Sequence, residues 1–378
     1  MKFFHISDLH LGKRLNDYSL IDDQKYILTK IINAADEEKP DAVIIAGDVY
    51  DKSVPSAEAV ALFDDFLCRL ARRRLTVLVI SGNHDSPERI AFGGRLMEAS
   101  GVHLSPVYDG SAEKVTVGDA YGEVDFYLLP FIKPANVRRF FPDEEIVTYT
   151  DALRRAVGAM EVDPSKRSVL VTHQFVTGAR RSDSEEISVG GADNVDGAVF
   201  DCFDYVALGH IHGPQNVGRE TLRYCGTPLK YSLSEAGDTK SITSVEMKEK
   251  GNTTVREIPL VPMRDLREIR GTYGQLTLRE NYEGTATDDY LHVVLTDEDD
   301  VPDALARLRI IYPNILDLDF DNARTRAAYN AELPDLSRYR SEAELFGDFF
   351  EKQNGRPMTE EQTARVAALF EKIKEESL

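Results

Sequence analysis

Short apolar segments that suit buried strands alternate with longer helical segments over the first two thirds of the chain, and this alternation constrains the fold most. The runs AVIIA at 42–46 and VLVI at 77–80 are apolar on both faces. A strand with two apolar faces must lie between two layers of the protein. The helical segments that separate the strands can supply those layers. The sequence therefore predicts an α/β protein in which β-sheets are flanked by helices.

The pattern of apolar residues changes near residue 264, and we expect four regions along the chain. The expected regions are 1–263, an α/β domain; 264–325, a small α+β capping domain; 326–340, a linker; and 341–378, a C-terminal helix pair. Within the first region, Ser86 and Pro87 predict the start of a helix that continues to about Ser100. Within the second region, residues 268–277 predict a strand.

The two C-terminal helices each begin with a capping box, formed by Ser341 with Glu344 and by Thr359 with Gln362. Their apolar residues recur at helical spacing and make one stripe on each helix. The stripe residues are Leu345, Phe346, Phe349, Phe350, Val366, Leu369, Phe370 and Ile373. Such a stripe either packs on the chain's own core or binds a partner, and the polar segment before it favours a partner.

The charge and the cysteine content exclude several classes of protein. The 378 residues include 45 Lys and Arg against 65 Asp and Glu, for a formal charge of −20. This excess argues against a protein that binds nucleic acid through a broad basic face. Three scattered cysteines form neither a disulfide framework nor a zinc ribbon. No stretch suits a signal peptide or a membrane span, so we expect a cytoplasmic protein without membrane contact.

Metal-binding residue types follow the ends of five expected strands, where open α/β sheets bind their ligands. The motifs are Asp8-Leu-His10, Gly47-Asp48, Gly82-Asn83-His84-Asp85, His173 and Gly209-His210-Ile-His212. Carboxylate, amide and imidazole donors without thiolate suit octahedral Mn²⁺, Mg²⁺ or Fe²⁺. Seven donors are too many for one ion with open positions, but they suit two ions that share a carboxylate. We therefore expect a two-metal hydrolytic site for a phosphate ester. His5 and His103 lie in apolar segments and are expected to be packing residues, whereas His292 belongs to the second region and has no donor residue nearby in sequence.

These ordered motifs resemble those of the calcineurin-like metallophosphoesterases. The longer strings SDLHLGK, IAGDVYD, SGNHDSPERI, THQF and ALGHIHGPQ are similar to the SbcD family of bacterial nuclease subunits. The resemblance implies a layered metallophosphoesterase sandwich, with the capping domain and the helix pair added to it. Mn²⁺ is then the favoured metal, and Mg²⁺ or Fe²⁺ are alternatives.

The resemblance also implies a role for each residue of the motifs. One metal would be surrounded by Asp8, His10, Asp48 and His212. The other metal would be surrounded by Asp48, Asn83, His173 and His210, so that Asp48 bridges the two. His84 would face the phosphate and assist the departure of the leaving oxygen. Asp85 would orient a histidine from behind.

The function expected from the resemblance is a double-strand exonuclease and single-strand or hairpin endonuclease in DNA end processing, repair and recombination. The expected assembly is a homodimer within a heterotetramer, in which the helix pair binds an SbcC-like coiled-coil ATPase. No Walker-type string occurs here, so ATP would have to act through that partner. Arg180 and Arg181 are equally consistent with DNA contacts and with solvated surface charge. The alternatives are a small-molecule or protein phosphoesterase on the same site, and a scaffold without catalysis.

Overall fold

The structure is a computed structural model that describes residues 1–183, 185, 193–323, 325, 342–354 and 357–376. The chain divides into two compact units. The first unit holds residues 1–294 and 302–319, and the second holds residues 295–301 and 320–378.

Two six-stranded sheets form the centre of the first unit. One sheet has the strand order β14-β13-β1-β4-β5-β6. Its strands are β1 (Lys2–Ile6), β4 (Ala42–Ala46), β5 (Thr76–Ile80), β6 (Val102–Leu104), β13 (Ser241–Met247) and β14 (Thr253–Pro259). The other sheet has the order β11-β12-β10-β9-β8-β7. Its strands are β7 (Glu113–Asp119), β8 (Gly122–Leu129), β9 (Arg167–His173), β10 (Tyr205–Gly209), β11 (Gln215–Val217) and β12 (Arg219–Tyr224). The central strands of each sheet run parallel, so their carboxyl ends lie along one edge.

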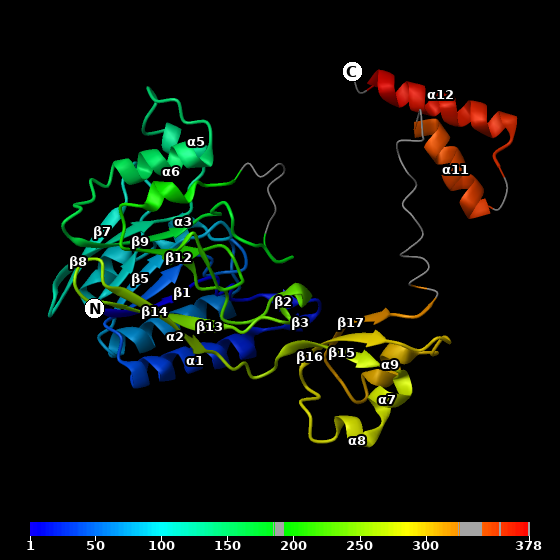
Figure 1. Ribbon diagram of the computed structural model, residues 1–378, viewed down its shortest axis with the longest axis horizontal. Coiled ribbons are helices and arrows are strands. Elements are labelled where there is room, and N and C mark those ends of the chain that lie inside the picture. Colours follow the sequence, from blue (N-terminus) through cyan, green and yellow to red (C-terminus); the bar gives the residue numbers. More distant parts are fainter. Residues whose placement is uncertain (184, 186–192, 324, 326–341, 355–356, 377–378) are drawn as a thin grey trace. The chain divides into compact units, whose positions relative to one another are not determined.

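The two sheets pack face to face, and helices cover their outer faces. Apolar side chains of both sheets form one buried cluster, in which the rings of Phe3 and Phe126 lie 5.6 Å apart. The helices α1 (Ile21–Glu38) and α2 (Ala57–Arg72) pack on the first sheet. The helices α5 (Pro134–Arg138) and α6 (Tyr149–Gly158) pack on the second, as Figure 1 shows. The predicted layered α/β sandwich is confirmed.

One segment departs from the predicted pattern between β5 and β6. The helix expected from Ser86 to Ser100 is broken into α3 (Pro87–Ile90), α4 (Gly94–Met97) and the 3-10 turn η1 (Glu98–Ser100). Gly93 has a φ of 78°, which a right-handed helix does not permit. The Gly93-Gly94 pair therefore ends the first helix early.

A smaller three-stranded sheet, of order β15-β16-β17, follows the sandwich in sequence. Its elements are β15 (Leu266–Gly271), α7 (Tyr273–Thr277), α8 (Arg279–Tyr282), β16 (Tyr290–Leu295), α9 (Ala304–Leu308) and β17 (Ile315–Phe320). The strand expected over residues 268–277 ends at Gly271, because Thr272 and Gln275 form a capping box that begins α7. The short elements β2 (Arg14–Leu15), β3 (Tyr18–Ser19), η3 (Gly197–Phe200) and η4 (Leu233–Glu235) also belong to the first unit.

The second unit contains the helices α11 (Glu342–Asn354) and α12 (Glu360–Glu376). The expected capping box of α12 is present, since Thr359 and Gln362 each accept a hydrogen bond from the other's backbone N–H. The rings of Phe346 and Phe370 lie 6.3 Å apart and join the two helices. Ser341 and the expected linker 326–340 lie outside the described residues. Among the described helices, none is long and apolar enough to cross a membrane.

Candidate metal centre

The structure gathers all seven expected donor residues at the carboxyl ends of β1, β4, β5, β9 and β10. Backbone hydrogen bonds hold the first two loops together: Asp8 N–H donates to Gly47 O at 3.0 Å, and His10 N–H donates to Asp48 O at 3.0 Å. The backbone N–H of His210 donates to the Asp8 carboxylate at 3.1 Å. This last hydrogen bond links the two sheets, so both sheets must be in place before the donors meet.

Four of the donor residues have backbone angles that are uncommon for residues with a side chain. The φ values are 52° for Asp8, 43° for His10, 47° for Asp48 and 103° for His210. Such conformations cost about 1–3 kcal/mol each and persist only where the surrounding structure holds them. The sharp turns direct the donor side chains towards one another instead of along the strands.

Glycine residues beside the donors allow a very close approach of the loops. A Cβ atom at Gly47 or Gly209 would lie 2.5 or 2.6 Å from His173 Nδ1. A Cβ atom at Gly82 would lie 2.1 Å from Asp48 Oδ1. These distances are far below ordinary contact, so the three positions require glycine.

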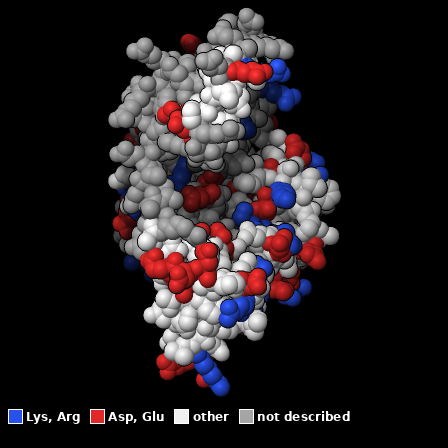
Figure 2. Space-filling model, turned by 90° about the vertical axis from the view of Figure 1, so that its right-hand side faces the viewer, with Lys and Arg blue, Asp and Glu red and all other residues white. Residues whose placement is uncertain are grey.

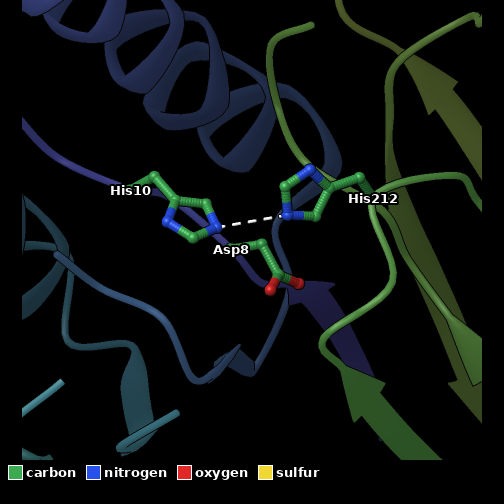
Figure 3. A group of neighbouring side chains, drawn as sticks. All are labelled: Asp8, His10 and His212. Atoms are coloured by element: carbon green, nitrogen blue, oxygen red, sulfur yellow. Dashed lines mark hydrogen bonds between the residues drawn. The ribbon is translucent and has the colours of Figure 1, made fainter. Parts of the chain in front are cut away.

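Asp8, His10 and His212 form the first group of donors. The Nε2 atoms of His10 and His212 lie 3.2 Å apart, and all three side chains are buried. Figure 3 shows the two imidazole rings facing each other, with the Asp8 carboxylate below them in that view. Nδ1 of His212 lies 3.4 Å from Glu235 Oε1, which leaves Nε2 to face the group.

Asn83, His173 and His210 form the second group. Asn83 Oδ1 lies 2.9 Å from His173 Nε2 and 3.0 Å from His210 Nδ1. The Asp48 carboxylate lies between the two groups, because its Oδ2 is 3.4 Å from His173 Nε2 and 3.8 Å from His10 Nε2. Asp48 is thus the carboxylate best placed to serve both groups.

The buried charges of the site shift the pKa values of its residues strongly. Burial, with the nearby charge of Asp48, raises the pKa of Asp8. Burial alone would lower the pKa of His173, but the carboxylates of Asp48 and Asp8 raise it to about 9. Burial and the charge of His173 lower the pKa of His210 to about 3. Without bound metal ions, two carboxylates and several imidazoles are therefore buried together, and burial disfavours the charged form of each group.

Divalent cations fit this set of donors. His173 Nδ1 lies 2.9 Å from Ala46 O, and a carbonyl only accepts, so Nδ1 carries a hydrogen and Nε2 is the atom that faces Asn83 Oδ1 and the Asp48 carboxylate. The nearby carboxylates raise the pKa of His173 and so favour a proton on Nε2, and a divalent cation can take the place of that proton. His210 Nε2 is buried without a hydrogen-bond partner among the described residues. The donors are oxygen and imidazole nitrogen, which suit Mn²⁺, Mg²⁺ or Fe²⁺.

A model of the calcineurin-like phosphoesterase family matches residues 1–214, which is more than half of the chain. The chain belongs to this family. The phosphoesterase is therefore a hydrolase, and its family implies divalent metal ions. A second family model, the Type 5 capsule protein repressor C-terminal domain, matches residues 262–354.

Similar proteins that align over most of the chain are named as the SbcD component of the nuclease SbcCD. The protein of that name from Staphylococcus saprophyticus is 34% identical over 380 residues, which cover 100% of the phosphoesterase and 99% of the relative. The one from Staphylococcus epidermidis is 34% identical over 322 residues, which cover 84% and 85%. A solved dimetal phosphatase from Danio rerio has a TM-score of 0.43 and 11% identity, covering 69% of the phosphoesterase and 96% of that chain.

His84 of the phosphoesterase lies at the open side of the metal centre. Its side chain is 22% exposed, whereas the His10 and His173 side chains are almost fully buried. Nδ1 of His84 lies 3.1 Å from the carbonyl oxygen of Asp51 and therefore carries a hydrogen. Nε2 faces the centre, 4.0 Å from Asp48 Oδ2. His84 can thus meet a substrate that approaches the donor groups from solvent.

Among the described residues, Asp85 contacts backbone N–H groups and no histidine ring, which differs from the expected role of orienting a histidine. Its carboxylate accepts hydrogen bonds from the backbone N–H groups of Val49, Tyr50 and Gly82, at 2.9–3.0 Å. Burial and the charge of Asp48 raise the pKa of Asp85 to about 7. Asp85 therefore holds the loop of Asp48 and the loop of Asn83 together. Its short side chain lies within hydrogen-bond distance of the backbone of both loops.

Two buried glutamates support His212, and no motif in the sequence indicates them. Glu235 lies in η4, contacts His212 Nδ1 and accepts a hydrogen bond from Lys240 Nζ at 2.7 Å. Glu185 accepts a hydrogen bond from the backbone N–H of His212 at 2.7 Å. The charges of Lys240 and His212 overcome the effect of burial and lower the pKa of Glu235. Glu185 lies in a loop and Glu235 in a three-residue 3-10 turn, and hydrophobic periodicity gives no signal for either.

Arg181 lies near the metal centre, whereas Arg180 makes no described contact with the donors. The guanidinium of Arg181 stacks on the ring of Phe175 at 3.7 Å and pairs with Asp193 at 2.6 Å. The ring of Phe175 in turn contacts His210.

Two histidines outside the metal centre, His5 and His292, differ in burial and in the partners of their rings. His5 is fully buried between the sheets, with Nδ1 2.9 Å from the hydroxyl of Tyr205, as expected of a packing residue. His292 instead lies on the small sheet between two carboxylates, 2.9 Å from Asp319 and 3.3 Å from Glu268. Neither partner is near His292 in sequence, because the two carboxylates come from the neighbouring strands β15 and β17.

Proposed function

We propose that the chain is the nuclease component of an SbcCD-like complex and hydrolyses DNA phosphodiesters with two divalent ions, Mn²⁺ being favoured. The observation that carries the proposal is the gathering of seven oxygen and nitrogen donors around Asp48. The SbcD-named relatives that align with the whole chain support DNA as the substrate. The expected activities are those of a double-strand exonuclease and a single-strand or hairpin endonuclease, in DNA end processing, repair and recombination.

In this proposal Asp8, His10, Asp48 and His212 hold one ion. Asp48, Asn83, His173 and His210 hold the other, and Asp48 is shared. Bound ions of this kind stabilise the negative charge that develops on the phosphoryl oxygens. The geometry supports the sharing, because Asp48 Oδ2 lies within 4 Å of an imidazole of each group.

His84 is the residue proposed to assist the departure of the leaving oxygen. Its Nδ1 is held by the Asp51 carbonyl, and its backbone N–H donates to Asp48 Oδ1 at 2.9 Å. The ring is thereby fixed with Nε2 towards the centre. In its protonated form Nε2 can donate a proton to the departing sugar oxygen or a hydrogen bond to the phosphoryl group.

The C-terminal helix pair, residues 341–378, is the proposed binding site for an SbcC-like coiled-coil ATPase. Among its described residues, Phe349 is 58% exposed and Leu369 is 53% exposed. Exposed apolar side chains of this kind are typical of helices that bind a partner. ATP would then act through that partner, and a homodimer within a heterotetramer is the proposed assembly.

The proposal is tested by incubating the purified chain, alone and with its ATPase partner, with Mn²⁺ and end-labelled duplex DNA. A bis-aryl phosphate ester is the parallel substrate. We expect turnover of the small ester in both preparations and cleavage of DNA at least in the complex. Turnover of the small ester without DNA cleavage in either preparation would reject the nuclease and leave a small-molecule or protein phosphoesterase.

A further inference from the structure

Aromatic rings touch four imidazoles of the metal centre, and each of these rings carries a cation. The ring of Tyr231 lies 5.5 Å from that of His10 and 6.1 Å from that of His212. Phe131 lies 6.2 Å from His173, and Phe175 lies 6.5 Å from His210. The cation over each ring is Lys13 over Tyr231 at 5.8 Å, Lys133 over Phe131 at 5.9 Å and Arg181 over Phe175 at 3.7 Å.

The three cations differ in whether a carboxylate neutralises their charge. Lys13 pairs with Asp51 at 3.0 Å, and Arg181 pairs with Asp193 at 2.6 Å. Lys133 is exposed and makes no ion pair with any residue that the structure describes. Lys133 is therefore the cation most available to an incoming anion.

The aromatic rings keep these cations close to the metal centre but out of it. A cation in direct contact with the donors would repel the metal ions, whereas a cation over a ring that contacts a donor stays nearby and gains a favourable contact with that ring. The cations can then attract the phosphates on either side of the reacting one, in addition to the reacting phosphate itself. A small ester has a single phosphate, but a nucleic acid strand has another on each side.

Individual cations near the site matter for attracting a polyanion, because the chain carries an excess of negative charge. On the face drawn in Figure 2, basic side chains are interspersed with acidic ones, and the described residues form no continuous basic band there. With a formal charge of −20 in the whole chain, a polyanion needs local cations to approach the site.

We propose that Lys13, Lys133 and Arg181 form subsites for the phosphates that flank the scissile one in a polynucleotide strand. This inference rests on the proposed nuclease function. It gives the site a means of preferring a phosphodiester chain to an isolated ester, which the metal donors alone do not provide.

The test compares a single-stranded oligonucleotide with a bis-aryl phosphate ester as substrates of the full chain in Mn²⁺. The variants are Lys13→Gln, Lys133→Gln and Arg181→Gln. We expect the ratio of kcat/KM for the oligonucleotide to kcat/KM for the ester to fall about tenfold in each variant. The slope of log kcat/KM for the oligonucleotide against log salt concentration should become shallower by about 0.7 for each cation removed.

The matched control is Lys30→Gln, because Lys30 lies over the ring of Tyr26 at 5.0 Å in α1, without a described contact to the metal centre. It should leave the ratio and the slope unchanged. Variants that match the wild type in both readouts would overturn the flanking subsites while the nuclease stands. An equal loss on both substrates would also overturn them, since it places the cations in the common reaction. Wild-type protein that cleaves the ester but no oligonucleotide, even with its partner, would reject the nuclease and the subsites together.

Discussion

The side chains of the metal centre and those of the C-terminal helix pair are held in very different ways. His173 is fully buried and is fixed on one side by the Ala46 carbonyl and on the other by Asn83 and Asp48. In the helix pair, Phe349 and Leu369 remain more than half exposed. Buried and strained residues are typical of a preformed reaction site, whereas exposed apolar residues are typical of a surface that binds a partner. Substitutions should therefore act on catalysis in the first region and on assembly in the second.

The strongest test of this contrast is Asp48→Asn. The shared carboxylate would be lost, so both ions should bind more weakly, and hydrolysis of a bis-aryl phosphate ester should fall by more than about 10⁴-fold, as expected when two sources of charge stabilisation are lost together. Metal content measured by mass spectrometry after dialysis should fall at both sites. A metal titration that leaves one site unaffected would contradict the shared role of Asp48.

A somewhat smaller effect is expected for His84→Gln. Its imidazole assists the reaction but lies outside the donor groups, so turnover should fall by about 10²–10⁴-fold while both metals stay bound. The measurements are ester hydrolysis and metal stoichiometry on the same sample. Loss of metal in this variant would mean that His84 has been given the wrong role.

Glu235→Gln should have a moderate effect, because Glu235 acts through His212. Loss of the carboxylate removes the partner that fixes His212 Nδ1, and metal affinity should fall about 10–100-fold. Isothermal titration with Mn²⁺ measures the affinity, and addition of excess Mn²⁺ should restore much of the turnover. The matched control is Glu144→Gln, an exposed partner of Arg155 remote in sequence from every donor motif, which should leave the affinity unchanged.

Removal of residues 341–378 should have the smallest effect on catalysis. Hydrolysis of the ester should change by less than about twofold, because every proposed donor belongs to the first unit and none is among the removed residues. Binding to the ATPase partner, measured by co-purification and by titration, should be abolished. Retained binding would place the interface elsewhere and would weaken the contrast between the two regions.

Local patterns predict the donors and the sandwich, but they predict few of the contacts that support the donors. Asp8 and Asp48 are identified because each follows a short apolar strand, and parallel strands bring such residues to one edge. Glu235 reaches the centre from the short turn η4 and Tyr231 from the loop before it, and no periodic pattern places them there. The backbone contacts of Asp85 depend on the shape of two loops, so local patterns identify the residue but assign it the wrong partner. The broken helix at Gly93 shows that a local glycine pair can override an otherwise sound helix start.

The hydrogen bond between His210 and Asp8 joins residues that are 202 positions apart, and the facing imidazoles of His10 and His212 have the same separation. A growing chain on the ribosome therefore has no first donor group until residue 212 has emerged. Contacts between such distant positions also form late in folding, because a long loop must close first. At the proposed site, metal loading would follow the docking of the two sheets. A chain shorter than 212 residues would accordingly be inert, so an enzyme of the proposed activity could not damage DNA before more than half of its 378 residues have been made.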